Sequence, residues 1–108
     1  MITVQLQFRT EGIVVGYVVT GHADYAPCGS DIVCAAVSAL TQAALLGLTE
    51  HLGLSPRVEI KAGYFSLTLP YGSEADVGVQ AILATLALAL NNIAEQYPER
   101  VCLKEVMV

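Results

Sequence analysis

The sequence predicts a small single domain of the α+β class, in the order ββα-ββα-β, with a mostly antiparallel sheet covered by two long apolar helices. Three observations support this prediction. Two pairs of neighbouring β-type segments have the spacing of hairpins, a long apolar segment of helical character follows each pair, and a short strand-like segment closes the chain. The 108 residues are the length of one domain, so we expect a single domain over residues 1–108.

The first hairpin is predicted to pair residues 2–9 with residues 13–20. In the first segment, ITVQLQFR, apolar and polar side chains alternate, as they do in a strand that is buried on one face. The second segment, IVVGYVVT, is rich in β-branched residues and indicates a more buried strand. Gly12 lies between the two segments and marks the turn.

A loop and a long helix are expected after the first hairpin. Residues 21–30 contain Gly, Pro and Ser, which interrupt any periodic pattern and predict a loop. Residues 31–51 then predict a helix, with Ser30 or Asp31 as its N-cap and Gly53 near its C-terminal end.

The second half of the chain repeats this order loosely. Residues 57–61 and 64–69 alternate apolar and polar side chains and predict a second hairpin. Ser73 and Asp76 have the spacing of a capping box, and the apolar helix that follows them is expected to run to about Tyr97. The final segment, VCLKEVMV, predicts the last strand.

Composition limits the possible partners and surroundings. The net charge is −5, the isoelectric point is near 4.7, and the five basic residues are scattered, so we expect no direct nucleic-acid binding. Residues 32–49 are uncharged, but they contain polar side chains and are flanked by Asp31 and Glu50, which argues against a membrane span. The chain is 55% hydrophobic and only 14% charged, which predicts a homodimer formed through the apolar helices. Three cysteines and the absence of a secretory leader predict a cytoplasmic protein with reduced thiols.

The segment GHADYAPCGSDIVCAAVSAL, residues 21–40, concentrates the chemically reactive side chains. Cys34 is expected in the first turn of the helix, where backbone N–H groups and the helix dipole favour a thiolate. Asp31 and Ser38 lie three residues before and four residues after it and share its helix face. His22 follows the second strand, and a Cys–His pair is the minimum for nucleophilic acyl transfer. Backbone N–H groups at the helix start are candidates for an oxyanion hole.

This segment resembles the signature of the bacterial ribosomal-processing cysteine protease Prp family. That signature is Gly-His-Ala, a short variable loop, and then Gly-x-Asp-Ile-Val-Cys-Ala-Ala-Val-Ser, and this chain matches both elements at residues 21–23 and 29–38. The resemblance implies that Cys34 is the nucleophile and that His22 is the general base and proton donor. The residues to which it gives a supporting role are Asp31, Ser38 and Gly21.

The resemblance also implies a reaction and a substrate. It implies a homodimeric endopeptidase that removes a short N-terminal extension from a basic large-subunit ribosomal protein, without a metal or other cofactor. Ala23, Tyr25 and Gly29 are expected to contact the substrate, and Tyr25 is a candidate wall for a pocket that receives an aromatic side chain. Cys28, in the variable loop, has no implied role.

Three alternatives remain open at this point. Cysteines in apolar helices are often small buried side chains, so the chain could be a non-enzymatic dimeric module that binds a ribosomal or assembly partner. His22, Cys28 and Cys34 are spaced H-x5-C-x5-C and could form a zinc site, although this matches no common ligand spacing. Cys28 and Cys34 could form a redox pair, although five residues separate them rather than two.

Overall fold

The computed structural model of the chain describes residues 1–10, 12–27 and 29–108, and it contains the strands and helices in the predicted order. A π-helical turn, η1, and a 3₁₀ turn, η2, accompany the two long helices. The elements are β1 (Ile2–Thr10), β2 (Ile13–Thr20), α1 (Ile32–Leu46), η1 (Gly47–His51), β3 (Arg57–Lys61), β4 (Tyr64–Thr68), η2 (Ser73–Ala75), α2 (Val77–Gln96) and β5 (Val101–Met107).

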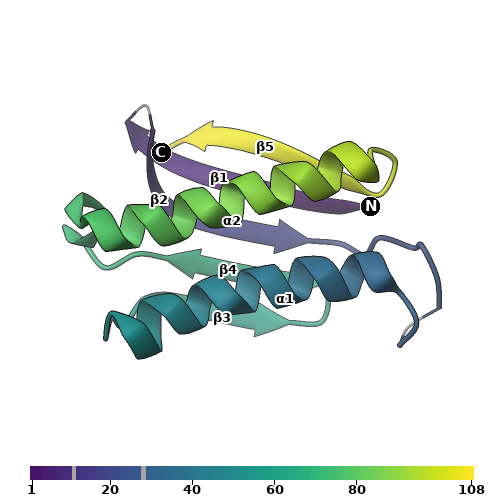
Figure 1. The fold of residues 1–108 in the computed structure, drawn as a ribbon, viewed down its shortest axis with the longest axis horizontal. Helices are drawn as coiled ribbons and strands as arrows, with labels where there is room; N and C mark the ends of the chain where they lie inside the picture. The colour runs from purple at the N-terminus through teal and green to yellow at the C-terminus, as the bar shows by residue number, and fades with distance from the viewer. Residues whose placement is uncertain (11, 28) are drawn as a thin grey trace.

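The five strands form one sheet in the order β3-β4-β2-β1-β5. The pairs β1–β2, β2–β4 and β3–β4 are antiparallel, and β5 pairs with β1 in parallel. Helices α1 and α2 lie next to each other across one face of this sheet (Figure 1). The predicted small α+β domain with a mostly antiparallel sheet is therefore confirmed.

The core fills the space between the sheet and the helices. Val4 and Leu6 on β1, Tyr17 on β2 and Leu67 on β4 point to the helices and are at most 2% exposed. Each helix contributes a buried stripe at helical spacing, as expected for a helix packed along a sheet. The stripe of α1 is Val33, Val37, Thr41 and Ala44, and that of α2 is Val79, Leu83, Leu86 and Leu90.

The start of α2 differs from the prediction. The expected capping box between Ser73 and Asp76 is wrong: Asp76 is itself the N-cap, and its side chain accepts a hydrogen bond from the N–H of Val79 at 3.1 Å. Ser73 instead begins η2, and its Oγ donates to the carbonyl of Pro70 at 2.6 Å. The physical reason is that an aspartate directly before a helix caps it with its own carboxylate and needs no reciprocal partner.

Both long helical segments, Ile32–His51 and Val77–Gln96, are long and apolar enough to cross a membrane by length and composition alone. Each nevertheless packs one stripe against the sheet, and core helices of soluble proteins pass the same test. The outer side of each helix is also apolar, since Leu46 on α1 is 57% exposed and Leu88 on α2 is 73% exposed.

Candidate active site

The site is built at the start of α1, where Asp31 caps the helix. Asp31 has an extended backbone, with φ −84° and ψ 101°, and its Oδ1 accepts hydrogen bonds from the N–H groups of Val33 and Cys34 at 3.0 and 2.9 Å. Asp31, rather than Ser30, is therefore the N-cap. Cys34 is the third residue of α1, which is the first-turn position predicted for it. Because both N–H groups are already bonded to Asp31, they are unsuitable as the expected oxyanion hole in this arrangement.

The second oxygen of Asp31 holds the preceding loop. Its Oδ2 accepts hydrogen bonds from the N–H groups of Tyr25 and Ala26 at 3.0 and 3.4 Å. These contacts, led by the N–H of Cys34, hold the pKa of Asp31 below its ordinary value, against a smaller opposing effect of desolvation. Asp31 is thus an ionised side chain at neutral pH that joins the loop to the helix.

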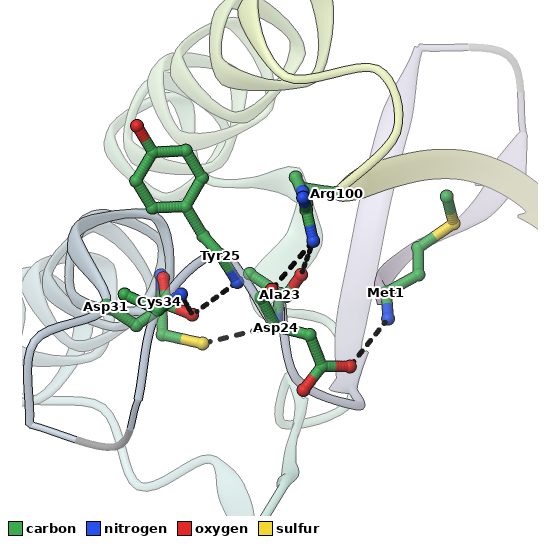
Figure 2. Close-up of polar contacts among 8 residues, drawn as sticks. Met1, Ala23, Asp24, Tyr25, Asp31, Cys34 and Arg100 are labelled. Carbon is green, nitrogen blue, oxygen red and sulfur yellow. Dashed lines mark hydrogen bonds and ion pairs between the residues drawn. The ribbon is translucent and has the colours of Figure 1, made fainter.

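The Cys34 thiol faces the backbone of the same loop. The N–H of Ala23 donates to Cys34 Sγ at 3.3 Å (Figure 2). A hydrogen bond to sulfur stabilises the charged form of a thiol, which is the form that acts as a nucleophile. The contact links the residue after His22 directly to Cys34.

His22 lies against the turn between β3 and β4. A Cβ atom on Gly63, in that turn, would lie 2.9 Å from His22 Nε2, so the imidazole packs closely on the glycine. Gly21 has a φ of +88° and donates its N–H to the carbonyl of Gly63 at 2.9 Å. A Cβ atom on Gly21 would also lie 2.2 Å from the carbonyl oxygen of Met1, so this position requires glycine. Gly21 therefore positions the backbone that carries His22.

Two hollows meet at the predicted pair of catalytic residues. His22, Cys34 and Ser38 line both of them. The first hollow, of about 230 Å³, runs toward the β3–β4 hairpin, and its other walls include Gly21 and several apolar side chains. The second, of about 540 Å³, lies along the loop and includes Gly29 and Asp31 in its walls. The apolar walls of the first hollow are Ile2, Val19, Val37, Ile60 and Phe65.

Two of the expected substrate contacts lie elsewhere. Ala23 is 1% exposed and lines neither hollow, so it presents its N–H to the site rather than its side chain. The ring of Tyr25 packs edge-on against Tyr97, with ring centroids 5.6 Å apart, and also lines neither hollow. Figure 2 shows Tyr25 directed away from the Cys34 sulfur. The expectation that Tyr25 walls the pocket thus lacks support in this geometry.

The described residues offer little to a metal ion. Within residues 1–10, 12–27 and 29–108, no group of three His, Cys, Asp or Glu side chains is placed to hold one. The zinc and redox alternatives both require Cys28, which lies outside the described residues. Cys34 and Cys102 are free thiols.

Comparison with known proteins decides between an enzyme and a non-enzymatic module. A family model described as cysteine protease Prp matches residues 1–102. The ribosomal processing cysteine protease Prp of Staphylococcus aureus (strain Mu50 / ATCC 700699) is 34% identical over 108 residues, which cover 94% of this chain and 95% of that protein. The chain belongs to the cysteine protease Prp family. It is therefore a cysteine-type endopeptidase of the ribosomal-processing family rather than a non-enzymatic module.

Other members and solved structures agree with the Prp assignment. The Prp protein of Bacillus subtilis (strain 168) is 29% identical over 90 residues, or 80% of each chain. A crystal structure of the S. aureus Prp protease with a covalently linked product peptide has a TM-score of 0.90 and 30% identity, covering 97% of this chain and 99% of that one. SMU.848 from Streptococcus mutans has a TM-score of 0.83 and 32% identity, covering 100% of this chain and 96% of that one.

Sequence reasoning missed two groups that shape this Prp site. Gly63 packs against the imidazole of His22, and the only sequence feature that pointed to Gly63 was its place in a predicted hairpin turn. Arg100 donates to the carbonyls of Asp24 and Ala23 at 2.7 and 3.4 Å. A side chain that recognises backbone carbonyls across 77 residues leaves no pattern in the sequence, so only the fold reveals it.

Proposed function

We propose that this endopeptidase uses Cys34 as its nucleophile and His22 as general base and proton donor. The observation that carries the proposal is that these two side chains, from separate elements, share the walls of two adjoining hollows. A peptide that lies across both hollows passes over the Cys34 sulfur. The Ala23 N–H at 3.3 Å from that sulfur adds support, because it favours the nucleophilic thiolate.

The reaction follows from the chemistry of the two groups. His22 takes the thiol proton, and the Cys34 sulfur attacks the carbonyl carbon of the scissile peptide bond. The C–N bond then breaks as the imidazolium gives its proton to the leaving amine, which leaves a thioester on Cys34. Water deprotonated by His22 attacks the thioester, releases the carboxylate product and restores the thiol. The S. aureus relative solved with a covalently linked product peptide is consistent with a peptide bound at a reactive residue.

The substrate we propose is the short N-terminal extension of a basic large-subunit ribosomal protein. The curated relatives are described as ribosomal processing proteases, and a second S. aureus structure contains a substrate peptide. The apolar first hollow suits an apolar or aromatic substrate side chain beside the cut. The net charge of −5 favours encounter with a basic protein through long-range attraction. A ribosomal substrate also places the reaction in the cytoplasm.

The test uses a peptide that copies the extended N-terminus of the host's large-subunit ribosomal protein, with mass spectrometry to locate the cut. We expect one internal cut with the wild type and none with Cys34→Ala or His22→Ala. The chain provides matched controls in Cys102→Ala and His51→Ala, which remove the same side chains away from both hollows and should cleave normally. Cleavage by Cys34→Ala would reject this nucleophile, whereas absence of cleavage by folded, reduced wild type would reject the substrate.

We also infer that two copies associate through the outer faces of α1 and α2. The groove between these helices is lined mainly by apolar and small side chains, and exposed Leu46, Val77 and Leu88 extend the apolar surface. Close helix packing between small residues would cover this surface. Size-exclusion chromatography with light scattering should give a dimer for the wild type and a monomer for Leu88→Glu. A monomeric wild type would reject the interface. The groove residues are Leu40, Ala43, Ala44, Gly47, Ala81, Ile82, Thr85, Leu86 and Ala89.

A further inference from the structure

Arg100 connects the end of α2 to the loop that carries the site. Its backbone is fixed on both sides: its N–H donates to the carbonyl of Tyr97 at 2.9 Å, and its own carbonyl accepts from the N–H of Ile2 at 2.8 Å. From this anchor, Nη1 donates to the carbonyl of Asp24 at 2.7 Å and to that of Ala23 at 3.4 Å (Figure 2). The side chain therefore joins the turn between α2 and β5 to the loop before α1.

Ala23 is held from two opposite directions as a result. Its carbonyl accepts from Arg100, and its N–H donates to the sulfur of Cys34 at 3.3 Å. Its side chain is buried, at 1% exposure, which leaves the residue little freedom to move. Displacing the carbonyl would turn the adjoining backbone and change the direction of the N–H that faces the thiol.

The neighbouring residue shows that this backbone needs support. Asp24 has a φ of +54°, the left-handed conformation that side chains other than glycine seldom adopt. Such a conformation persists where surrounding contacts hold it in place. The short hydrogen bond from Arg100 to the Asp24 carbonyl is one such contact. The ring of Tyr25, whose centroid lies 5.9 Å from the guanidinium carbon, holds the arginine from the other side.

We propose that Arg100 is a positioning residue for the nucleophile: it fixes the Ala23 backbone so that the N–H of Ala23 stabilises the Cys34 thiolate. The proposal rests on the proposed function in taking Cys34 as the nucleophile. Arg100 lines neither hollow, so it acts through Ala23 and makes no contact with a peptide that occupies them. The guanidinium stays charged at every relevant pH, so its hold on the loop does not change with pH.

The experiment measures alkylation of Cys34 by iodoacetamide as a function of pH, with each modified cysteine located by mass spectrometry. For Arg100→Ala we expect alkylation of Cys34 to require a higher pH than in the wild type, because the Ala23 N–H is no longer held toward the sulfur. The alkylation rate at neutral pH should fall about tenfold, and kcat should fall while KM changes little. Arg57→Ala, at an exposed arginine on the edge strand β3, is the matched control and should leave the profile unchanged.

Two further variants protect the test against simple unfolding. Arg100→Lys keeps a donor for the same carbonyls without the planar guanidinium, so it should lie between wild type and Arg100→Ala. Tyr25→Leu removes only the ring beside the guanidinium and should shift the profile in the same direction by less. Circular dichroism reports whether each variant is folded. If Arg100→Ala is unfolded, the alkylation profiles of Arg100→Lys and Tyr25→Leu decide the question.

The results distinguish a failure of the proposed role of Arg100 from a failure of the proposed function of Cys34. An unchanged alkylation profile in folded Arg100→Ala, or in both Arg100→Lys and Tyr25→Leu, would overturn the role of Arg100 and leave the proposed function intact. A loss of activity that appears only as a higher KM would also overturn it, because that result indicates substrate binding. If wild-type Cys34 reacts no faster than Cys102, and Cys34→Ala still cleaves, the proposed function itself fails.

Discussion

The first turns of α1 and α2 have the same N-cap structure, but only the first turn of α1 contributes to the candidate active site. Each helix is capped by an aspartate with an extended backbone, Asp31 with ψ 101° and Asp76 with ψ 130°. In each, the carboxylate accepts the N–H of the third helical residue. That third residue is the half-buried Cys34 in α1 and Val79, 1% exposed, in α2. The same cap therefore presents a reactive thiol in one helix and a core side chain in the other.

The difference comes from how each helix is rotated on the sheet. The buried stripe of α1 begins at its second residue, Val33, whereas that of α2 begins at its third, Val79. One residue corresponds to a rotation of about 100° about the helix axis. This offset moves the third residue of α1 from the sheet to the flank, where it lines the two hollows.

The two carboxylates also differ in the number of backbone groups that they hold. Asp76 accepts from the helix alone, through Val79. Asp31 accepts from the helix with Oδ1 and from Tyr25 and Ala26 of the loop with Oδ2. The cap of α1 thus uses its second oxygen to assemble a site, a task that has no counterpart at Asp76 within the described part of the chain.

Exchanging the third residues of the two helices, by Cys34→Val in α1 and Val79→Cys in α2, should give the largest difference in cleavage. Cys34→Val should lower the rate of peptide cleavage at least about a thousandfold, because it removes the sulfur that forms the thioester. Val79→Cys should retain cleavage and lose about 1 kcal/mol of unfolding free energy, because it slightly underfills a core position. Cleavage rates and urea unfolding check both variants. Normal cleavage by Cys34→Val would show that α1 does not supply the nucleophile.

Replacing each capping aspartate by asparagine should have the next largest effect. Asparagine caps helices as well as aspartate does, so Asp76→Asn should leave both stability and cleavage nearly unchanged. Asp31→Asn keeps one oxygen for the helix but turns an NH₂ group toward the N–H donors of Tyr25 and Ala26. We expect cleavage to fall about tenfold and the loop to become more sensitive to proteolysis. Equal behaviour of the two variants would mean that the loop contacts contribute nothing.

The loop contacts of Asp31 should also appear, as a smaller effect, in the pH dependence of thermal stability. The pKa of Asp31 is lowered in the folded chain, so its contribution is complete above the ordinary value of 3.8 and is lost as the pH falls through the lower folded value. The difference in Tm between wild type and Asp31→Asn should therefore be constant near neutral pH and shrink below about pH 4. Thermal melts from pH 7 to pH 2 measure it, and a difference that grows on acidification would contradict the assignment.

Most of the fold was predictable because it follows from patterns of hydrophobicity. The alternation in residues 2–9 and the hairpin of residues 57–61 and 64–69 gave the strands, since side chains in a half-buried strand alternate between faces. The capping box at Ser73 was wrong because an Asp, three residues after a Ser, has two possible roles that the sequence alone does not separate. The π-helical turn η1 at the end of α1 has no comparable sequence signal.

The candidate site was predictable only where its residues are neighbours in sequence. Asp31, Cys34 and Ser38 were placed on one helix face by helical spacing alone, and the structure puts all three in the walls of one hollow. Gly63 and Arg100 were missed because each acts on a backbone or ring brought close by the fold. The contact of Tyr25 with Tyr97 could not be predicted either, because Tyr97 follows the end of α2 and only the fold brings the two rings together.

The smallest expected effect concerns Ser38, one turn below the nucleophile. The equivalent position in α2, four residues after Val79, is Leu83, which is 1% exposed in the core. Ser38 is instead exposed, lines both hollows, and accepts a hydrogen bond on its Oγ from Gln42 Nε2 at 3.0 Å. Among the described residues the Ser38 hydroxyl donates no hydrogen bond, so its hydrogen can bond to a bound peptide.

Ser38→Ala should accordingly raise KM about threefold, the cost of one neutral hydrogen bond, with kcat and Tm nearly unchanged. Gln42→Ala serves as the control, because it removes the partner of Ser38 and keeps the hydroxyl itself. It should change KM less than Ser38→Ala does. If kcat of Ser38→Ala instead falls a hundredfold at constant KM, Ser38 acts on the reacting groups. The rotation of α1 would then have placed two catalytic side chains on its exposed flank, one turn apart, rather than one.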